Sequence, residues 1–142
     1  MITAGWLAFE DPQNRFLLRL PANWKVLNDS PDNFVIQEPN RRAELAIAFL
    51  DGDCAAAQNS LRARRLNYYL IREYTRSIGG LETTAFEFKD TISNIREFHA
   101  FCRAGRRCCH LRSRRSEGSE GLELESTLET MLSSFEFTTK KS

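Results

Sequence analysis

The side chains of this chain best suited to binding a soft metal ion are found among its two histidines, His99 and His110, and the adjacent cysteines Cys108 and Cys109. If Ala104 and Gly105 form a two-residue turn, the flanking segments pair as a hairpin with His99 opposite His110. Cys108 would then share their face, and imidazole and thiolate are ligands that zinc prefers. No fourth ligand is evident, and a register slip of one residue would separate these side chains. We therefore predict packing and no bound metal, with a metal or small-ligand site near His99 and His110 as the alternative.

The cysteines could also act as nucleophiles, because a thiol beside a histidine ionises more readily. However, no acidic orienting residue or oxyanion donor is placed beside them by the sequence. Nearby arginines could lower a thiol pKa without any catalytic purpose. The chain contains no Gly-x-Ser-x-Gly, phosphate-loop or dinucleotide glycine pattern. We predict no enzymatic activity, no catalytic residues and no cofactor.

Arginines are concentrated in the same hairpin and form the more informative pattern. The predicted binding residues there are Arg103, Arg106, Arg107, Arg112 and Arg114. Arginine pairs with carboxylates through a planar fork and is enriched at interfaces. An ordinary solvated surface, balanced by glutamates such as Glu82 and Glu97, is the alternative. We predict that hairpin 96–115 contacts a partner protein with an acidic surface.

The net charge of the chain argues against nucleic acid as the partner of this hairpin. With 20 basic and 19 acidic residues the chain carries a net charge of +1, and its aromatic residues form no stacking motif. Nucleic acid is therefore not predicted as a partner.

Trp24 follows the strand-ending Pro21 and is expected in the core. Trp6 lies near the N-terminus and is the sixth predicted binding residue, as an exposed anchor.

The elements that must position these residues follow from hydrophobic spacing. Residues 6–20 read as a hairpin around the turn Asp11-Pro12-Gln13-Asn14, and residues 28–33 read as a turn. Helices are expected from Cys54, behind an Asp53 cap, to about Leu70, and from a Ser119 cap to Phe135. Further strands are expected at 34–37, 43–50, 81–89, 95–103 and 107–115, with β-like sequence at 72–77. The order predicts an α+β fold, in which an antiparallel sheet of about six strands is flanked by helices on both faces.

The chain length and the cysteine content indicate how many domains to expect and in which cellular compartment. A chain of 142 residues, 42% apolar and 27% charged, is predicted to form a single domain over residues 1–142. The four cysteines match no secreted scaffold, so reduced thiols and a cytoplasmic location are expected. The first residues lack the pattern of a signal peptide, and no apolar run is long enough to span a membrane.

Three segments in order resemble the PsbP-like superfamily: RFLLRLPANWKV (15–26), SIGGLETTAF (77–86) and MLSSFEF (131–137). That superfamily includes an extrinsic photosystem II subunit, a Ran-binding nuclear-transport factor and chaperones of type VI secretion effectors. The resemblance implies an antiparallel sheet of six or seven strands between helices, and a protein-binding scaffold that is usually not catalytic. No family site transfers residue by residue. The predicted function is an adaptor, chaperone or accessory subunit of a larger complex.

Overall fold

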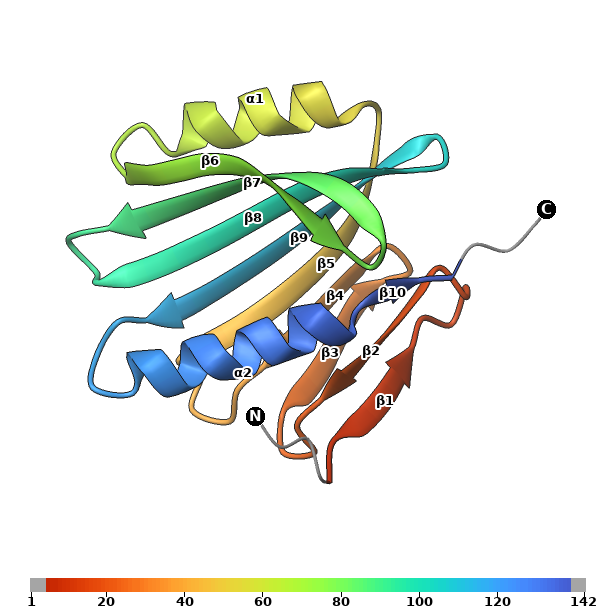
Figure 1. Cartoon of the computed structure of the whole chain (residues 1–142), viewed down its shortest axis with the longest axis horizontal. Helices are drawn as coiled ribbons and strands as arrows, with labels where there is room; N and C mark the ends of the chain where they lie inside the picture. Colours follow the sequence, from red (N-terminus) through yellow and green to blue (C-terminus); the bar gives the residue numbers. More distant parts are fainter. Residues whose placement is uncertain (1–4, 139–142) are drawn as a thin grey trace.

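The computed structural model describes residues 5–138, which form two antiparallel sheets and two helices (Figure 1). The large sheet has seven strands in the spatial order β3-β4-β5-β9-β8-β7-β6. Along the chain they are β3 (Lys25–Ser30), β4 (Asn33–Gln37), β5 (Ala43–Asp51), β6 (Tyr69–Ile78), β7 (Leu81–Asp90), β8 (Ile95–Ala104) and β9 (Arg107–Ser116). The helices are α1 (Cys54–Arg64) and α2 (Gly121–Ser134). The α+β class with a large antiparallel sheet is confirmed, although this sheet has seven strands rather than about six.

A second, three-stranded sheet has the order β1-β2-β10, with β1 (Leu7–Glu10), β2 (Phe16–Leu20) and β10 (Glu136–Phe137). The predicted hairpin 6–20 forms its β1–β2 pair. Asp11 makes the turn, because its carboxylate accepts hydrogen bonds from the backbone N–H groups of Gln13 and Arg15, each at 3.1 Å. The hairpin is completed by β10 rather than joined to the large sheet.

Alternate residues of β8 belong to two different hydrophobic clusters, since successive side chains of a strand point to opposite faces. Phe98, Ala100 and Cys102 pack in the larger cluster. The residues that α2 contributes to this cluster are Leu124, Leu128, Met131 and Leu132, as its spacing predicted. Phe101 packs in the smaller cluster, with Leu61 of α1. The two helices therefore contribute to different clusters, and alternate side chains of β8 belong to one cluster or the other.

Three predicted boundaries are wrong. Helix α1 has its Asp53 cap, whose carboxylate accepts from Ala56 N at 2.8 Å, but it ends at Arg64 because the chain has already turned into β6 by Tyr69. The residue that precedes α2 is Glu120, so Ser119 is not its cap. The predicted turn 28–33 is mostly strand, because β3 runs to Ser30 with an irregularity in its pairing after Asn28.

The expectation of four reduced thiols is also wrong. Cys54, the first residue of α1, forms a disulfide with Cys108 of β9, and their Cα atoms are 5.2 Å apart. Cys102 and Cys109 are free and buried, and they lie opposite each other on β8 and β9. A bond between residues 54 positions apart could not be read from local spacing. The cytoplasmic location stays a prediction, without the support of reduced thiols.

No helix among residues 5–138 has the length and apolar character that a membrane crossing requires.

Candidate protein-binding surface

The hairpin β8–β9 turns at Gly105 and Arg106, one residue later than predicted. Ala104 pairs with Arg107, and Gly105 has φ = 64°, a left-handed conformation that glycine adopts without strain. The register is consequently shifted by two residues, so His110 is opposite Phe101 and not opposite His99. A shift of two preserves the face of every side chain, because the alternation has a period of two.

Two arginines at the tip of this hairpin are exposed and carry unneutralised charge. Arg106 lies in the turn itself, and Arg103 is the penultimate residue of β8. Arg103 Nε donates to the carbonyl oxygen of Gly105 at 3.0 Å. Within residues 5–138, neither guanidinium has a carboxylate in ion-pair contact. These two predicted residues are therefore available to a partner.

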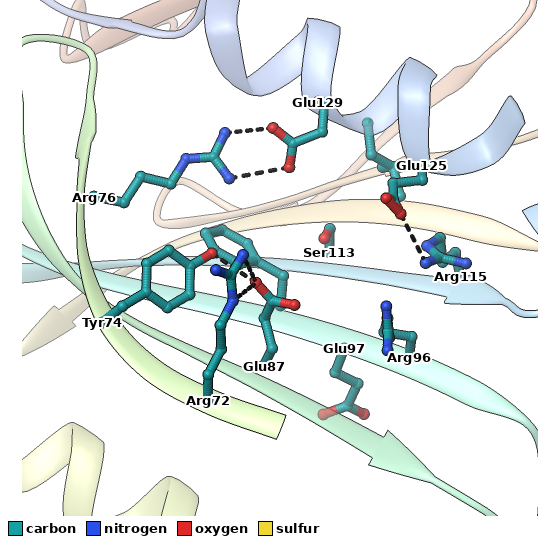
Figure 2. A pocket seen from close by; sticks show the side chains of 12 residues that line it. Arg72, Tyr74, Arg76, Glu87, Arg96, Glu97, Ser113, Arg115, Glu125 and Glu129 are labelled. Atoms are coloured by element: carbon teal, nitrogen blue, oxygen red, sulfur yellow. Dashed lines mark hydrogen bonds and ion pairs between the residues drawn. The ribbon is translucent and has the colours of Figure 1, made fainter. Parts of the chain in front are cut away.

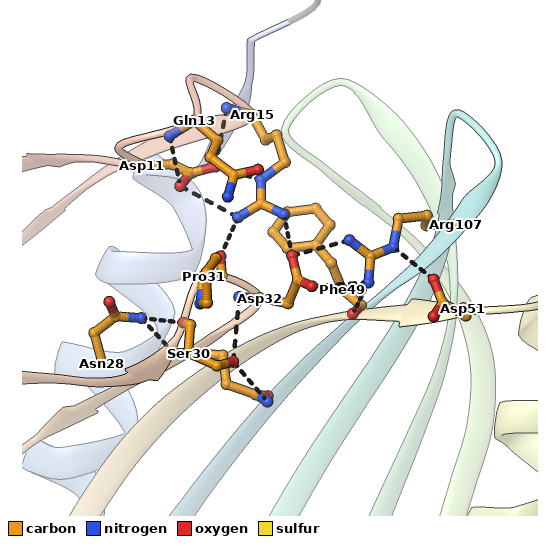
Figure 3. Close-up of polar contacts among 11 residues, drawn as sticks. Asp11, Gln13, Arg15, Asn28, Ser30, Pro31, Asp32, Phe49, Asp51 and Arg107 are labelled. Atoms are coloured by element: carbon orange, nitrogen blue, oxygen red, sulfur yellow. Dashed lines mark hydrogen bonds and ion pairs between the residues drawn. The ribbon is translucent and has the colours of Figure 1, made fainter.

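Arg107, by contrast, is used within the chain (Figure 3). Its two terminal nitrogens donate to both oxygens of Asp32, at 2.9 and 3.0 Å, and its Nε lies 3.2 Å from Asp51. Asp32 also accepts from Arg15 at 2.7 Å. The hydrogen bonds from Arg107 and Arg15 lower the pKa of Asp32 to about 2. Arg107 thus joins the β3–β4 turn to the hairpin, which neutralises its charge.

Arg112 and Arg114 point to the face of the sheet that carries the smaller cluster and are likewise paired. Arg112 donates to Glu44 of β5 at 2.5 Å, and Arg114 Nε lies 3.6 Å from Glu97. The five predicted arginines are therefore divided: three are in internal ion pairs, and the two at the tip have no carboxylate partner among residues 5–138.

The two histidines do converge, as the shared face predicted. His99 Nε2 lies 2.8 Å from Glu97 Oε1, and His99 Nδ1 lies 2.8 Å from His110 Nε2. Glu97 accepts only, so His99 carries its proton on Nε2 and accepts at Nδ1 from the Nε2–H of His110. The ring of His110 stacks on Phe101 with a centroid distance of 4.4 Å. The result is a hydrogen-bonded chain from Glu97 to His110.

Burial and hydrogen bonding together decide the charges of Glu97, His99 and His110. Glu97 and His99 are buried, at 2% and 1% exposed. Burial alone would raise the pKa of Glu97, but hydrogen bonds from His99 and Arg65 lower it to about 2. Burial lowers the pKa of His99, and it lowers the pKa of His110 to about 3. The carboxylate is therefore ionised and both imidazoles are neutral at neutral pH.

The metal and small-ligand alternative gains no support from this geometry. Cys108 is in a disulfide, and no group of three potential ligands occurs within the described residues 5–138. Neither His99 nor His110 lines one of the grooves described below. The histidines instead form a buried polar network that is satisfied by Glu97 and by each other.

Trp6 does not join the hairpin tip. It is half-buried, packs against the larger cluster and lines a groove together with Trp24, Glu38 and Arg42. The start of strand β1, directly after Trp6, lies at the end of that strand away from the β8–β9 turn (Figure 1). Trp24 is buried, as predicted. The six predicted residues therefore do not form one site.

A groove of about 400 Å³ adjoins the tip, between hairpin β8–β9 and the start of α1. Its lining includes Arg103, Arg106 and the half-buried Cys54. Two carboxylates are also present, those of Asp53, which caps α1, and Glu82. The groove extends the exposed arginines into a concave surface that has both polar and apolar parts.

A second cleft, of about 390 Å³, lies between β6 and α2 and was not predicted (Figure 2). Arg76 of β6 reaches Glu129 of α2 through two hydrogen bonds of 3.0 and 2.6 Å. Arg72 and Tyr74 both donate to Glu87, at 2.9 and 2.8 Å. These charges already have partners, so the cleft offers an external partner less free charge than the tip.

The spacing of charged residues in the sequence indicates each wall of this cleft separately. Arg72 and Arg76 fall on one face of a strand, and Glu125 and Glu129 fall on one face of a helix. Nothing local in the sequence indicates that these two faces meet, since β6 and α2 are distant along the chain. Figure 2 shows them across the cleft from each other.

Comparison with known proteins identifies the fold. No family model and no curated protein sequence matches the chain. The cyanobacterial PsbP protein (CyanoP) of Synechocystis is similar at 13% identity, over 94% of this chain and 93% of that chain, with a TM-score of 0.68. The Saccharomyces cerevisiae Ran-binding protein Mog1p is similar at 11% identity, over 94% and 95%, with a TM-score of 0.63. LpqN of Mycobacterium tuberculosis, involved in cell envelope biogenesis, is similar at 13% identity, over 94% and 91%, with a TM-score of 0.55.

These likenesses span nearly the whole chain and confirm the PsbP-like resemblance at the level of fold. Identities of 11–13% establish the architecture alone.

Proposed function

We propose that the chain is a non-catalytic protein-binding module that recognises an acidic surface of its partner through Arg103 and Arg106. The observation that carries this proposal is the contrast within one hairpin. Arg107, Arg112 and Arg114 are held by Asp32, Glu44 and Glu97, whereas the two arginines at the tip are exposed and have no carboxylate partner within residues 5–138. In this role the chain serves as an adaptor, chaperone or accessory subunit of a larger complex.

Free and paired arginines differ in what they offer a partner. A guanidinium that already has a carboxylate partner must lose that interaction before it gains another. An exposed, unpaired guanidinium attracts an acidic surface from a distance and forms a two-pronged contact on arrival. The tip therefore orients the approaching partner and speeds its association. The groove beside the tip offers a surface for further contacts with the same partner.

The fold is consistent with this role. One of the similar structures is a Ran-binding protein, and the PsbP-like fold is the architecture that the two share. The residues with the greatest acid–base potential, His99 and His110, are engaged with Glu97 and Phe101, which supports a role without catalysis.

The test uses the native cell and two variants of equal charge. We would capture partners with the wild-type chain, with R103E/R106E, and with R19E/K25E, in which two exposed cations of β2 and β3 are reversed instead. The partner is expected to be retained by the wild type and by R19E/K25E. Reversal at the tip is expected to weaken its purified complex by about ten-fold or more, because like charges would then face each other.

The matched variants separate a local contact from the effect of net charge. Equal retention by all three chains would contradict the proposed surface. Equal loss from both variants would show a dependence on net charge alone, which also contradicts it.

A further inference from the structure

The disulfide between Cys54 and Cys108 has two ends of very different accessibility. Cys108 is 0% exposed and lies in the smaller cluster, beside Leu61 and Phe101. Cys54 is half-buried and lines the groove of about 400 Å³ at the hairpin tip. Cys102 also lines the groove, but it is 4% exposed and packs in the larger cluster. A nucleophile that enters the groove therefore meets the sulfur of Cys54, and Cys108 acts only as the sulfur that leaves or returns.

The surroundings of Cys54 favour negative charge. It is the first residue of α1, where the backbone N–H groups carry the positive end of the helix dipole, and the first turn contains no acidic residue. Arg103 and Arg106 line the same groove. The carboxylates of Asp53 and Glu82 reduce this positive potential only in part. Asp53 already accepts a hydrogen bond from Ala56 N at the start of α1. A thiolate approaching Cys54 is thus attracted, and a thiolate on Cys54 is stabilised.

We propose that Cys54–Cys108 is a reversible thiol–disulfide exchange site for small anionic thiols. The attacking thiolate bonds to Sγ of Cys54, the Cys54–Cys108 bond breaks, and Cys108 leaves as a thiolate that takes a proton from water. In the reverse step, the Cys108 thiolate attacks Sγ of Cys54 and expels the small thiolate. A second molecule of the thiol completes reduction, which yields two protein thiols and one small-molecule disulfide.

The size and charge of the groove define the class of thiol. A volume of about 400 Å³ falls at the lower end of ordinary ligand pockets, which suits a short peptide thiol. Arg103 and Arg106, which have no carboxylate partner within the described part of the chain, suit a molecule with free carboxylates. Glutathione has both properties and is the probe for the test.

The first experiment compares two thiols on the intact, oxidised chain. Opening of the disulfide by reduced glutathione and by 2-mercaptoethanol is followed by alkylation and intact mass. Both attack as thiolates, but 2-mercaptoethanol lacks the carboxylates of glutathione. R103E/R106E is expected to slow the reaction with glutathione about ten-fold and the reaction with 2-mercaptoethanol by about three-fold or less. An equal effect on both thiols, or no effect on either, would overturn the proposal.

The second experiment locates the adduct. Incubated with glutathione disulfide, C108S is expected to accumulate a glutathione adduct on Cys54 with release of one reduced glutathione, because the resolving sulfur is absent, whereas folded C54S is expected to leave Cys108 unmodified. Peptide mapping distinguishes these positions from the buried Cys102 and Cys109. An adduct on Cys108 of folded C54S, or none on Cys54 of C108S, would overturn the assignment. These readouts are rates and adducts, so their outcome is independent of whether the tip also binds a protein.

Discussion

The imidazoles of His99 and His110 are joined directly, with Nδ1 of His99 2.8 Å from Nε2 of His110. The other nitrogen of His99 lies 2.8 Å from a buried carboxylate oxygen of Glu97. One proton lies between His99 and Glu97, and one lies between the two rings, so this arrangement requires both imidazoles to be neutral. Protonation of either ring would place a positive charge in a buried network that has no counter-ion for it beyond Glu97.

Acidification is therefore expected to destabilise the fold. An unfolded histidine titrates near pH 6.5, whereas burial lowers the pKa of His99 and lowers that of His110 to about 3. Between those values the unfolded chain binds more protons, so the free energy of unfolding falls as the pH falls, by up to about 1.4 kcal/mol per pH unit for each proton. Glu97, with its pKa lowered to about 2, adds to the loss below its ordinary pKa of 4.5.

Urea unfolding between about pH 7 and pH 4.5 measures this slope. The control is H110Q, whose amide can still donate to Nδ1 of His99 but cannot take up a proton. Its slope is expected to be about half that of the wild type, since one of two titrating rings is gone. Identical slopes would show that His110 titrates normally in the folded chain.

The disulfide makes a direct prediction about thiol counts and stability. Under denaturing conditions without reductant, two thiols should react per chain, those of Cys102 and Cys109, out of four cysteines. Reduction is expected to lower the free energy of unfolding by about 2–4 kcal/mol, because the bond closes a long loop in the unfolded chain. Four reactive thiols in the denatured, unreduced chain would contradict the bond.

The adjacent glycines Gly79 and Gly80 should respond differently to alanine. Both have left-handed backbones, with φ of 61° and 83°. At Gly79 a Cβ would lie 3.1 Å from the carbonyl oxygen of Phe135 and 3.1 Å from the ring of Phe137, whereas at Gly80 nothing lies within 4 Å. G80A is expected to cost about 1 kcal/mol from its backbone alone, and G79A about 1 kcal/mol more. Equal thermal or urea stability of the two variants would contradict this packing.

Local patterns predicted the parts of the fold that depend on local chemistry. The hairpin 6–20 was predictable because Asp11 forms a turn with its own side chain. The buried face of α2 was predictable from its leucine spacing. β3 was missed because the turn-forming residues Asn28 and Ser30 lie in an edge strand, where each pairs with β4 across an irregularity in the register. The same residue types serve both structures, so only pairing with β4 decides between them.

The candidate site was predicted in composition but not in arrangement. The face shared by His99, Cys108 and His110 survived a register error because the error was of two residues. The division of the arginines into paired and free members depends on Asp32 and Glu44, which approach from β3–β4 and β5. The disulfide depends on where α1 begins relative to β9. Such contacts are set by tertiary packing, so spacing along the chain carries no signal for them.

The dissociation constant of the purified partner complex, measured at low and at high salt, tests the central claim most directly. For the wild type and for R19E/K25E we expect affinity to fall steeply with salt, because exposed charges are screened. For R103E/R106E we expect a complex weakened by about ten-fold or more at low salt, with little further loss at high salt. An affinity that is unchanged by salt, or unchanged by reversal of Arg103 and Arg106, would contradict recognition of an acidic surface by the hairpin tip.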